Sequence, residues 1–305
     1  MQAMLLAAGF GTRLRPYTLV RPKPLFPVCN VPLLHILLDM LRDAGVRRVV
    51  VNGHHLADQV EDAVADRPEV VFQREPEILG TGGSLRRALE NLSDEPLLVM
   101  NGDIYHGIDI SSLYAHHLSS PCSVTMAVHD FRRFNTVAVR GDRVCGFSEE
   151  DLQPDHELLA FTGIHVLDRE VIEQIPGQGF FHIIDLYREL AACGQVGSYR
   201  VDGAMWRDIG TPEDYLDLHR ELLAGRQGNW CISEQADVAG DARLLDWGAV
   251  GAGVKIGAGA RLRRCVVWDH AVVADHAVCS DMIICKEEQG VTGRFFKPRT
   301  DTDKH

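Results

Sequence analysis

Positively charged side chains gather in one early stretch of an otherwise acidic chain. Arg13, Arg15, Arg21 and Lys23 fall within residues 7–24, where no Asp or Glu occurs, although the chain of 305 residues has a formal net charge of -12. Four cations without a local acid repel one another unless an anion neutralises them. The stretch therefore favours binding of a polyanion such as a triphosphate, and a solvated basic surface loop is the alternative.

Two glycines, Gly9 and Gly11, directly follow the apolar run QAMLLAA. Glycine lets backbone N–H groups approach a phosphate, so the turn suits an anion-binding loop. The dinucleotide-binding fingerprint is excluded because its third glycine is Leu14 here, and the second expected strand ends in VVVNGHH without an acid. The Walker A motif is excluded because no Gly-Lys pair occurs in the chain.

The elements that must position these residues alternate between strand-like and helix-like patterns over residues 1–225. Strands are expected at 2–8, 47–52, 69–75 and 96–103, and helices at 32–45, 56–66, 82–92, 181–194 and 211–225. This alternation predicts an α/β fold with a Rossmann-like, mostly parallel sheet that is covered on both faces. Ligands of such sheets bind beyond the carboxyl ends of the strands, where both AAGFG and NGD fall.

A different period begins after residue 229. Aliphatic residues recur every six positions and then, after one four-residue step, every six again: Val238, Leu244, Val250, Ile256 and Leu262, followed by Val266, Val272, Val278 and Ile284. The period predicts hexapeptide repeats that form a short left-handed parallel β-helix of roughly three coils. We therefore predict a catalytic domain at 1–228, a β-helix at 229–285 and a polar tail at 286–305.

Composition excludes several classes of function. The acidic balance argues against a nucleic-acid binder, which needs a basic face. The eight cysteines form no CxxC pair, which indicates reduced thiols without a zinc site. The N-terminal apolar run is too short for a signal peptide, and no run is long enough to span a bilayer. We expect a cytoplasmic protein that has neither a membrane nor a nucleic-acid partner.

The stretch LLAAGFGTRLRPYTLVRPKP, followed by a helix, closely resembles the signature of sugar-1-phosphate nucleotidylyltransferases. The resemblance extends over residues 1–225 at matching spacing and includes LGTGGSLRRAL, NGD, FTGIHVL and WRDIGTPEDY. It implies the nucleotide-diphospho-sugar transferase type of sheet and an enzyme of EC 2.7.7 type. Such enzymes join a nucleoside triphosphate to a sugar 1-phosphate and release pyrophosphate, so the protein must bring two polyanions together.

The resemblance also implies residue roles at the phosphates. Arg13 would grip the β- and γ-phosphates and Lys23 would lie at the reacting centre, as catalytic residues. Asp103 and Asp208 would hold Mg²⁺, which prefers a few carboxylates together with phosphate oxygens. The resemblance implies that two segments bind the nucleotide. The glycine loop contributes Leu6, Ala7, Ala8, Gly9, Gly11 and Thr12, and a later turn near the base contributes Thr81 and Gly82.

Base and sugar recognition depart from the common family pattern. Many uridylyl- and thymidylyltransferases have a glutamine just before the base-contacting turn, where this chain has Ile78. Glu149 in GFSEE corresponds to a sugar-contacting acid, but the lysine and proline that usually follow it are replaced by Glu150 and Asp151. Thr162 and Gly163 occupy the second sugar-side turn.

These departures leave several functions open. The missing glutamine and the hexapeptide tail favour a mannose-1-phosphate guanylyltransferase-like enzyme, whereas residues 1–225 are also similar to N-acetylmuramate-1-phosphate uridylyltransferases. A non-catalytic regulatory subunit that binds a nucleotide sugar is the alternative of a different class. An acyltransferase acting through His270 and His276 of the tail is a weaker alternative. We expect a homo-oligomer whose partners are a nucleoside triphosphate and a sugar 1-phosphate.

Overall fold

The computed structural model describes residues 1–225 and 228–286. Their internal contacts divide the chain into two compact units. The first unit is Met1–Gly9 with Ile36–Trp206, and the second is Phe10–His35 with the residues from Arg207 onward. The predicted boundary at residue 228 differs from this division and stays a prediction. The predicted tail lies outside the described residues apart from Lys286.

The first unit is built on a sheet of nine strands, counted over the described part of the chain, in the order β5-β4-β1-β6-β11-β8-β12-β10-β9. The strands are β1 (Gln2–Leu6), β4 (Arg48–Gly53), β5 (Val70–Arg74), β6 (Leu97–Asn101), β8 (Val124–His129), β9 (Asn135–Arg140), β10 (Arg143–Gly146), β11 (Glu157–Leu167) and β12 (Val196–Arg200). The four N-terminal strands among them lie where the hydrophobic pattern predicts strands.

Parallel pairing joins β5, β4, β1 and β6, and again joins β8 and β12. β11 instead runs antiparallel to both β6 and β8, and β9 and β10 form an antiparallel hairpin. The sheet is therefore mixed rather than mostly parallel as predicted: a two-residue turn joins the antiparallel neighbours β9 and β10, and β11 enters the sheet between β6 and β8 in the opposite direction. In the parallel half, Leu6 lies opposite Asn101, so AAGFG and NGD leave the sheet side by side.

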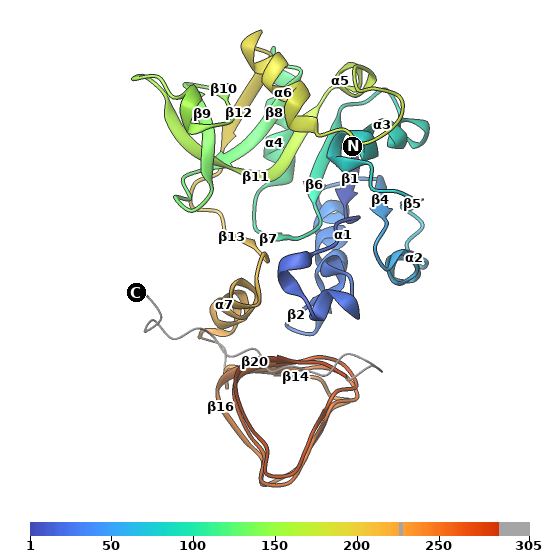
Figure 1. Cartoon of the computed structure of the whole chain (residues 1–305), viewed down its shortest axis with the longest axis vertical. Helices are drawn as coiled ribbons and strands as arrows, with labels where there is room; N and C mark the ends of the chain where they lie inside the picture. Colours follow the sequence, from blue (N-terminus) through green and yellow to red (C-terminus); the bar gives the residue numbers. More distant parts are fainter. Residues whose placement is uncertain (226–227, 287–305) are drawn as a thin grey trace. The chain divides into compact units, whose positions relative to one another are not determined.

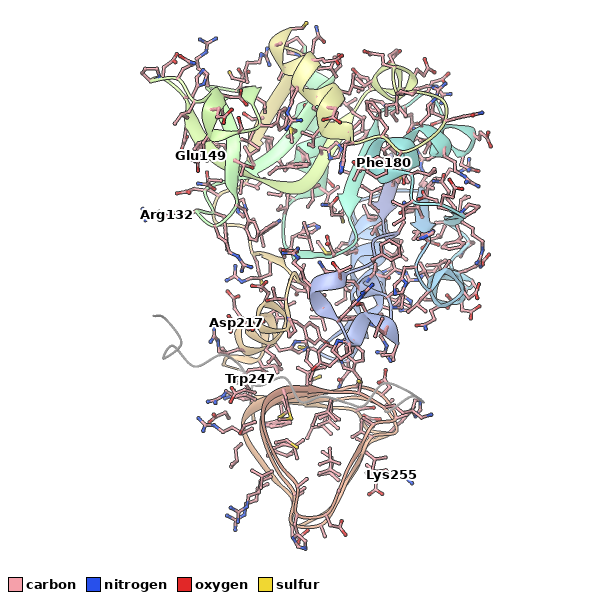
Figure 2. The ribbon with its side chains drawn as sticks, viewed as in Figure 1. Arg132, Glu149, Phe180, Asp217, Trp247 and Lys255 are labelled. Atoms are coloured by element: carbon pink, nitrogen blue, oxygen red, sulfur yellow. The ribbon has the colours of Figure 1, made fainter. Side chains whose placement is uncertain are left out.

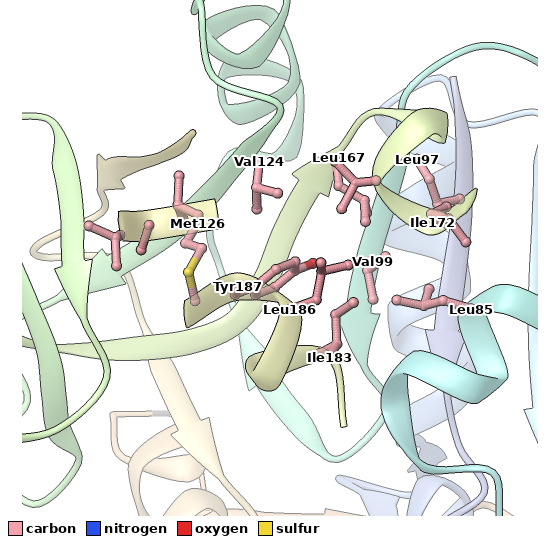
Figure 3. Close-up of a cluster of buried hydrophobic side chains, with 14 of the residues drawn as sticks. Leu85, Leu97, Val99, Val124, Met126, Leu167, Ile172, Ile183, Leu186 and Tyr187 are labelled. Atoms are coloured by element: carbon pink, nitrogen blue, oxygen red, sulfur yellow. The ribbon is translucent and has the colours of Figure 1, made fainter. Parts of the chain in front are cut away.

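Helices α2 to α6 belong to the first unit, and α1 begins in the second unit and ends in the first. Their bounds are α1 (Leu33–Asp43), α2 (Ala57–Val64), α3 (Gly80–Ala88), α4 (Ile110–Ser119), α5 (Arg169–Glu173) and α6 (Ile183–Ala192), with the shorter elements η4 (Leu89–Asn91), β7 (Ile104–His106) and η5 (Glu149–Asp151). Figure 3 shows part of the core, where Leu186 and Tyr187 of α6 and Leu85 of α3 meet strand residues such as Val99 and Met126.

The second unit begins with three short 3-10 turns and a hairpin and ends with stacked coils. Its elements are η1 (Thr12–Leu14), η2 (Tyr17–Leu19), η3 (Lys23–Leu25), β2 (Pro27–Val28), β3 (Val31–Pro32), α7 (Pro212–Leu223), β14 (Trp230–Ile232), β15 (Asp237–Val238), β16 (Arg243–Val250), β17 (Lys255–Ile256), β18 (Arg261–Val267), β19 (Val272–Val273) and β20 (Val278–Ile284). Strand β13 (Trp206–Asp208) leads into it. Helix α7 starts as predicted, with the Thr211 side chain accepting the Asp214 N–H and Pro212 at the first position.

The C-terminal strands stack in parallel register. Strands β14, β16, β18 and β20 form one ladder and β15, β17 and β19 form another. Viewed along their axis, these coils have a triangular outline (Figure 1). We call residues 230–284 the coil stack. Its interior is apolar and is filled by small and branched side chains such as Val254, Ile256, Ala260 and Leu262.

The predicted six-residue phase is wrong at Val272 and Val278. Val272 and Val278 were expected inside but are 69% and 74% exposed, whereas Val273 and Cys279 are buried. Register explains the shift: Arg243 pairs with Arg261, but Arg261 pairs with Val278, so the second coil is one residue shorter than the first. After Leu262, the interior cluster continues with Cys265 and Val267 and does not include Val266.

Candidate active site

The loop that follows β1 starts in the first unit, at the carboxyl end of the sheet. The Ala7 N–H donates to Asn52 Oδ1 of β4 over 2.6 Å, and the Gly102 N–H donates to Leu6 O over 2.8 Å. Ala8 lies between these anchored residues and Gly9. A Cβ on Gly9 would meet no atom within 4 Å, so this glycine faces open space. The main chain at Gly9 is accordingly accessible to a ligand.

Gly11 makes the turn that begins residues 11–32 of the second unit, which we call the loop segment. It has a left-handed φ of 57°, and a Cβ there would stand 2.7 Å from Thr18 Cγ2. Its carbonyl accepts hydrogen bonds from the Leu14 N–H and the Thr18 hydroxyl. Only glycine fits both the backbone conformation and the space. The turn leaves Thr12 and Arg13 exposed on η1.

Arg13 and Lys23, predicted as catalytic, both face Asp208. Lys23 Nζ lies 3.5 Å from Asp208 Oδ1, and Arg13 Nη2 lies 3.9 Å from Asp208 Oδ2. Lys23 is 7% exposed and stands between two prolines on η3, so its main chain is stiff. Gly210 permits this grouping because a Cβ there would lie 2.5 Å from Asp208 Oδ2 and 3.2 Å from Arg13 Nη1. The arrangement places two cationic groups next to each other, which suits an anionic ligand.

The cation cluster of the sequence is divided by the fold. Arg21 does not join Arg13 and Lys23 at Asp208; its Nη2 lies 3.4 Å from Asp269 Oδ2 on the coil stack. Arg21 was grouped with Arg13 and Lys23 as a possible phosphate-binding residue only because the three are close together in the sequence. Its acidic partner lies 248 residues away in the sequence, so local charge counting could not find it.

Asp103, predicted as a metal ligand, follows β6 in the first unit and is partly buried. The turn that carries it packs against β1: a Cβ on Gly102 would stand 2.8 Å from both Leu6 O and Leu5 Cδ2. Gly102 is therefore required for this close approach. The structure brings Asp103 to the edge of the sheet where the Ala7–Gly9 loop begins, as the parallel register of β1 and β6 demands.

Thr81 and Gly82, predicted to lie near the nucleobase, start helix α3 and contact the segment before α6. The Gly82 N–H donates to Phe181 O over 2.9 Å, and Thr81 Oγ1 accepts the Ile183 N–H over 3.2 Å. A Cβ on Gly82 would lie 2.6 Å from Phe181 Cδ1, which explains the glycine by packing. Beside it, Phe180 is 61% exposed and its side chain is labelled in Figure 2. The predicted base contact stays a prediction.

A buried polar network beneath the same helix was missed by the sequence. Asn52 Nδ2 donates to Glu75 Oε1 and to Ser84 Oγ, both over 3.0 Å, and Gln73 Nε2 donates to Glu75 Oε1 over 3.0 Å. Through Asn52, the network ties the Ala7 loop to the first turns of α3. Glu75 Oε2 and Gln73 Oε1 are buried and receive no hydrogen bond from any residue within 1–225 or 228–286. The sequence signal for this network was the presence of polar residues near the ends of two apolar strands.

The predicted sugar-side turn is a bulge in β11. Thr162 is fully buried: its hydroxyl donates to Ala127 O over 2.8 Å, and its carbonyl accepts the Trp206 indole N–H over 2.9 Å. Gly163 has φ 78°, and a Cβ there would stand 2.6 Å from Asn101 Nδ2. The bulge therefore lies against the end of β6. The Thr162 side chain serves the fold, so a sugar contact at this turn would fall to the main chain.

Glu149 lies exposed on η5 after β10 (Figure 2). Asp151, which replaces the proline of the family pattern, has a structural role. Asp151 Oδ2 accepts hydrogen bonds from the Phe147 N–H over 2.8 Å and from the N–H and hydroxyl of Ser148, both over 3.0 Å. The Phe147 N–H above all lowers the pKa of the Asp151 carboxyl below its ordinary value. Asp151 therefore caps this turn.

Comparison with known proteins agrees with this fold. The family model described as "Nucleotidyl transferase" matches residues 2–225. The mannose-1-phosphate guanylyltransferase of Mycobacterium tuberculosis is 33% identical over 288 residues, covering 88% of this chain and 80% of that one. The N-acetylmuramate alpha-1-phosphate uridylyltransferase of Caulobacter vibrioides is 30% identical over 246 residues, covering 72% and 96%. HddC from Yersinia pseudotuberculosis, in a crystal structure complexed with GMP-PN, superimposes with a TM-score of 0.62 at 26% identity, covering 72% and 99%.

The α/β fold and the family model that matches residues 2–225 define a transferase of nucleotidyl groups. The chain belongs to the nucleotidyl transferase family, and its activity is that of a sugar-1-phosphate nucleotidylyltransferase. This confirms the family and the reaction class expected from the sequence. Within the described residues, no helix has the length and apolar character needed to cross a membrane.

Proposed function

We propose that the chain is a mannose-1-phosphate guanylyltransferase. A phosphate oxygen of mannose 1-phosphate attacks the α-phosphorus of GTP, the bond from that phosphorus to the bridging oxygen of the β-phosphate breaks, and the electron pair leaves on pyrophosphate. The observation that carries the proposal is the meeting of Lys23 and Arg13 at Asp208. Two relatives support the substrates: one is a mannose-1-phosphate guanylyltransferase, and HddC crystallised as a complex with GMP-PN.

Lys23 and Arg13 divide the work on the phosphates. Lys23 is buried and held between prolines, so its ammonium group is a fixed charge that can stabilise the α-phosphate as negative charge moves to the leaving group. Arg13 is exposed, and its planar guanidinium suits bidentate contact with the β- and γ-phosphates. The loop from Leu6 to Thr12 holds the nucleotide through the main-chain groups that the fold does not use.

Guanine is favoured by the buried acceptors beneath α3. Glu75 Oε2 and Gln73 Oε1 receive no donor within the described chain, and Asn52 connects Glu75 to the Ala7 loop. Guanine presents N–H donors at N1 and at its 2-amino group, whereas uracil presents one N–H between two carbonyl oxygens. An ionised carboxylate only accepts hydrogen bonds, so Glu75 matches guanine better than uracil. Thr81 and Gly82 border the base in this proposal.

Mg²⁺ is the proposed cofactor, with Asp103 and Asp208 as its protein ligands. Both supply carboxylate oxygens, which are the hard ligands that Mg²⁺ prefers. Among residues 1–225 and 228–286, no three His, Cys, Asp or Glu side chains are grouped to hold a metal. This fits an ion that takes one or two carboxylates and completes its shell with phosphate oxygens. Bound Mg²⁺ would neutralise charge on the transferred phosphates.

The remaining assignments complete the proposal. Glu149 and the main chain at Thr162 and Gly163 border the sugar. The hexapeptide period and the parallel register support a left-handed parallel β-helix for the coil stack. We expect a homo-oligomer in the cytoplasm, where nucleoside triphosphates are made.

A pyrophosphate-release assay tests the function. The full chain is incubated with Mg²⁺, with each of GTP, UTP, dTTP and CTP, and with mannose 1-phosphate or N-acetylmuramate 1-phosphate. The expected outcome is fastest release with GTP and mannose 1-phosphate. Preference for UTP with N-acetylmuramate 1-phosphate would instead make it a uridylyltransferase, as the Caulobacter relative's name suggests. Folded chain that is silent in every combination would indicate a regulatory subunit.

A further inference from the structure

The indole of Trp268, on the coil stack, is surrounded by side chains of the early loop segment. Its ring centroid lies 4.7 Å from that of Phe26 and 5.9 Å from that of Tyr17, and Arg21 Cζ lies 4.8 Å from it. Trp268 is 2% exposed. A residue of the C-terminal repeats is thus the centre of an aromatic cluster whose other members belong mainly to residues 17–26.

Hydrogen bonds fix this cluster from several sides. Trp268 Nε1 donates to the Tyr215 hydroxyl over 3.2 Å, and that hydroxyl in turn donates to Pro27 O. The Tyr17 hydroxyl donates to Ile283 O over 3.4 Å. Farther along the segment, Asn30 Nδ2 at the hairpin tip donates to Cys231 O over 3.1 Å and to Val250 O over 2.9 Å. The segment that carries Lys23 is therefore bound to the coil stack along its length.

Asp269 joins a corner of the coil stack to Arg21. Asp269 Oδ1 accepts the Ala252 N–H of the preceding coil over 2.9 Å, and Asp269 Oδ2 lies 3.4 Å from Arg21 Nη2. Arg21 is two residues before Lys23, with only Pro22 between them. Because proline restricts the main chain, the position of Arg21 constrains where Lys23 begins.

We propose that Asp269 and Trp268 are positioning residues for the nucleotidyl transfer, which hold Lys23 and Arg13 at Asp208 by fixing Arg21 and the aromatic side of the loop segment. The inference rests on the proposed function of Lys23. It gives the C-terminal repeats a part in the reaction, and it makes Arg21 an anchor of the loop rather than a phosphate ligand.

The chain contains a natural control one repeat later. The sequence WDHAVV at 268–273 is followed by ADHAVC at 274–279. Asp275 Oδ1 accepts the Ala258 N–H over 2.9 Å, as Asp269 accepts that of Ala252. The residue before Asp275 is the exposed Ala274 instead of Trp268, and the structure shows no ion pair for Asp275 within the residues it describes. Both aspartates thus serve the coil, and only Asp269 also contacts the loop segment.

The test compares Asp269→Asn with Asp275→Asn in the full chain. Asparagine keeps the Oδ1 that accepts the neighbouring N–H, but its amide nitrogen cannot pair with Arg21. We expect Asp269→Asn and Arg21→Gln each to lower kcat on the order of tenfold with little change in KM, since a small misplacement of a catalytic group has such effects. The double variant should be no slower than the slower single variant. Asp275→Asn should keep wild-type kcat.

Hydrogen exchange gives a readout independent of turnover. The Leu25 and Phe26 N–H groups donate to Pro22 O and Lys23 O. These amides should exchange faster in Asp269→Asn and Arg21→Gln than in the wild type or Asp275→Asn. Equal kcat and equal exchange in Asp269→Asn and Asp275→Asn would overturn the inference. A wild-type chain without transferase activity would refute the proposed function instead, and the exchange comparison would still decide whether Asp269 fixes the segment.

Discussion

Gly163 packs against Asn101 so closely that a Cβ on Gly163 would stand 2.6 Å from the Asn101 amide nitrogen. The contact joins the bulge of β11 to the end of β6, just before Asp103. Gly163 also has a φ of 78°, which side-chain-bearing residues rarely adopt. Any other residue at position 163 would therefore face both backbone strain and steric overlap with Asn101.

Gly163→Ala should destabilise the chain by roughly 2 to 5 kcal/mol, from left-handed strain together with overpacking. Gly194→Ala is the matched control, because Gly194 has φ 69° but a Cβ there would meet nothing within 4 Å. That variant should lose only about 1 to 2 kcal/mol. Denaturant unfolding measures both, and equal losses would show that the Asn101 contact adds nothing.

Lys23→Ala should reduce kcat on the order of a hundredfold, since it removes a fixed charge from the transition state. The side chain is buried beside Asp208, so a thermal melt must accompany the kinetics. Lys255→Ala removes an exposed lysine from the coil stack and is the control for net charge (Figure 2). Wild-type turnover in Lys23→Ala would remove Lys23 from the reaction.

Asp103→Asn should raise the Mg²⁺ concentration needed for half-maximal rate, on the order of tenfold or more. Asp109→Asn is a suitable control, because Asp109 Oδ1 caps α4 through the Ser112 N–H and asparagine caps equally well. Magnesium titrations of the initial rate make the comparison. If the two variants respond alike, Asp103 is not a metal ligand.

Glu75→Gln should reduce the preference for GTP over ITP, whose base lacks the 2-amino group. Loss of a charge-assisted hydrogen bond predicts a change of about tenfold or more in the ratio of kcat/KM values. Glu77→Gln, an exposed change two residues away, should leave the ratio unaltered. An unchanged ratio in Glu75→Gln would argue that the base is read elsewhere.

Stability should fall as the pH drops from about 6.5 toward 4. Burial lowers the pKa of His219 from 6.5 to about 4. Its Nε2 accepts the Cys29 N–H over 3.1 Å, and its Nδ1 bonds Tyr215 O, so the fold holds the neutral ring. Between these pH values the unfolded chain binds more protons, so the free energy of unfolding decreases with acidity, by up to about 3 kcal/mol for this histidine. His106, with its pKa lowered to about 4 by burial, adds in the same direction.

Urea unfolding at several pH values measures this slope. His219→Asn should flatten it, because the variant has no ring to protonate. His276→Asn is the control: His276 is exposed and left-handed at φ 58°, a conformation that asparagine tolerates. A slope that is the same in both variants would show that His219 does not contribute.

Local patterns predicted the elements that carry strong periodicity or clear ends. Helix α7 begins at the Thr211 and Pro212 signals, and β1 and β6 end where glycine follows an apolar run. The alternation of strands and helices predicted parallel strands, and this placed the Ala7–Gly9 loop and Asp103 at one edge of the sheet. Helix α4 was missed although Asp109 supplies a local N-cap signal for it. The antiparallel direction of β11 was not expected, because it depends on long-range strand pairing that residue order does not reveal.

The candidate site was predictable only where the signal was local. Lys23 stands in a proline-flanked motif, and Asp208 follows an aromatic–basic pair. Asn52 and Glu75 were overlooked because each is a single polar residue near a strand end, and their link needs the packing of β4 against β5. Arg21 was grouped with the wrong cations for the same reason: its carboxylate comes from the distant repeats.

Tyr17 and Ile283 are joined by a hydrogen bond across 266 residues of sequence. Trp268, which covers the aromatic side chains of the loop segment, lies far beyond Tyr17 and Phe26 in the sequence and is therefore synthesised much later. During translation, Tyr17 and Phe26 lack their contact with Trp268 until that residue has been made. Packing of this segment must therefore follow synthesis of the repeats, and a nascent chain truncated before them would lack the indole that packs against both rings.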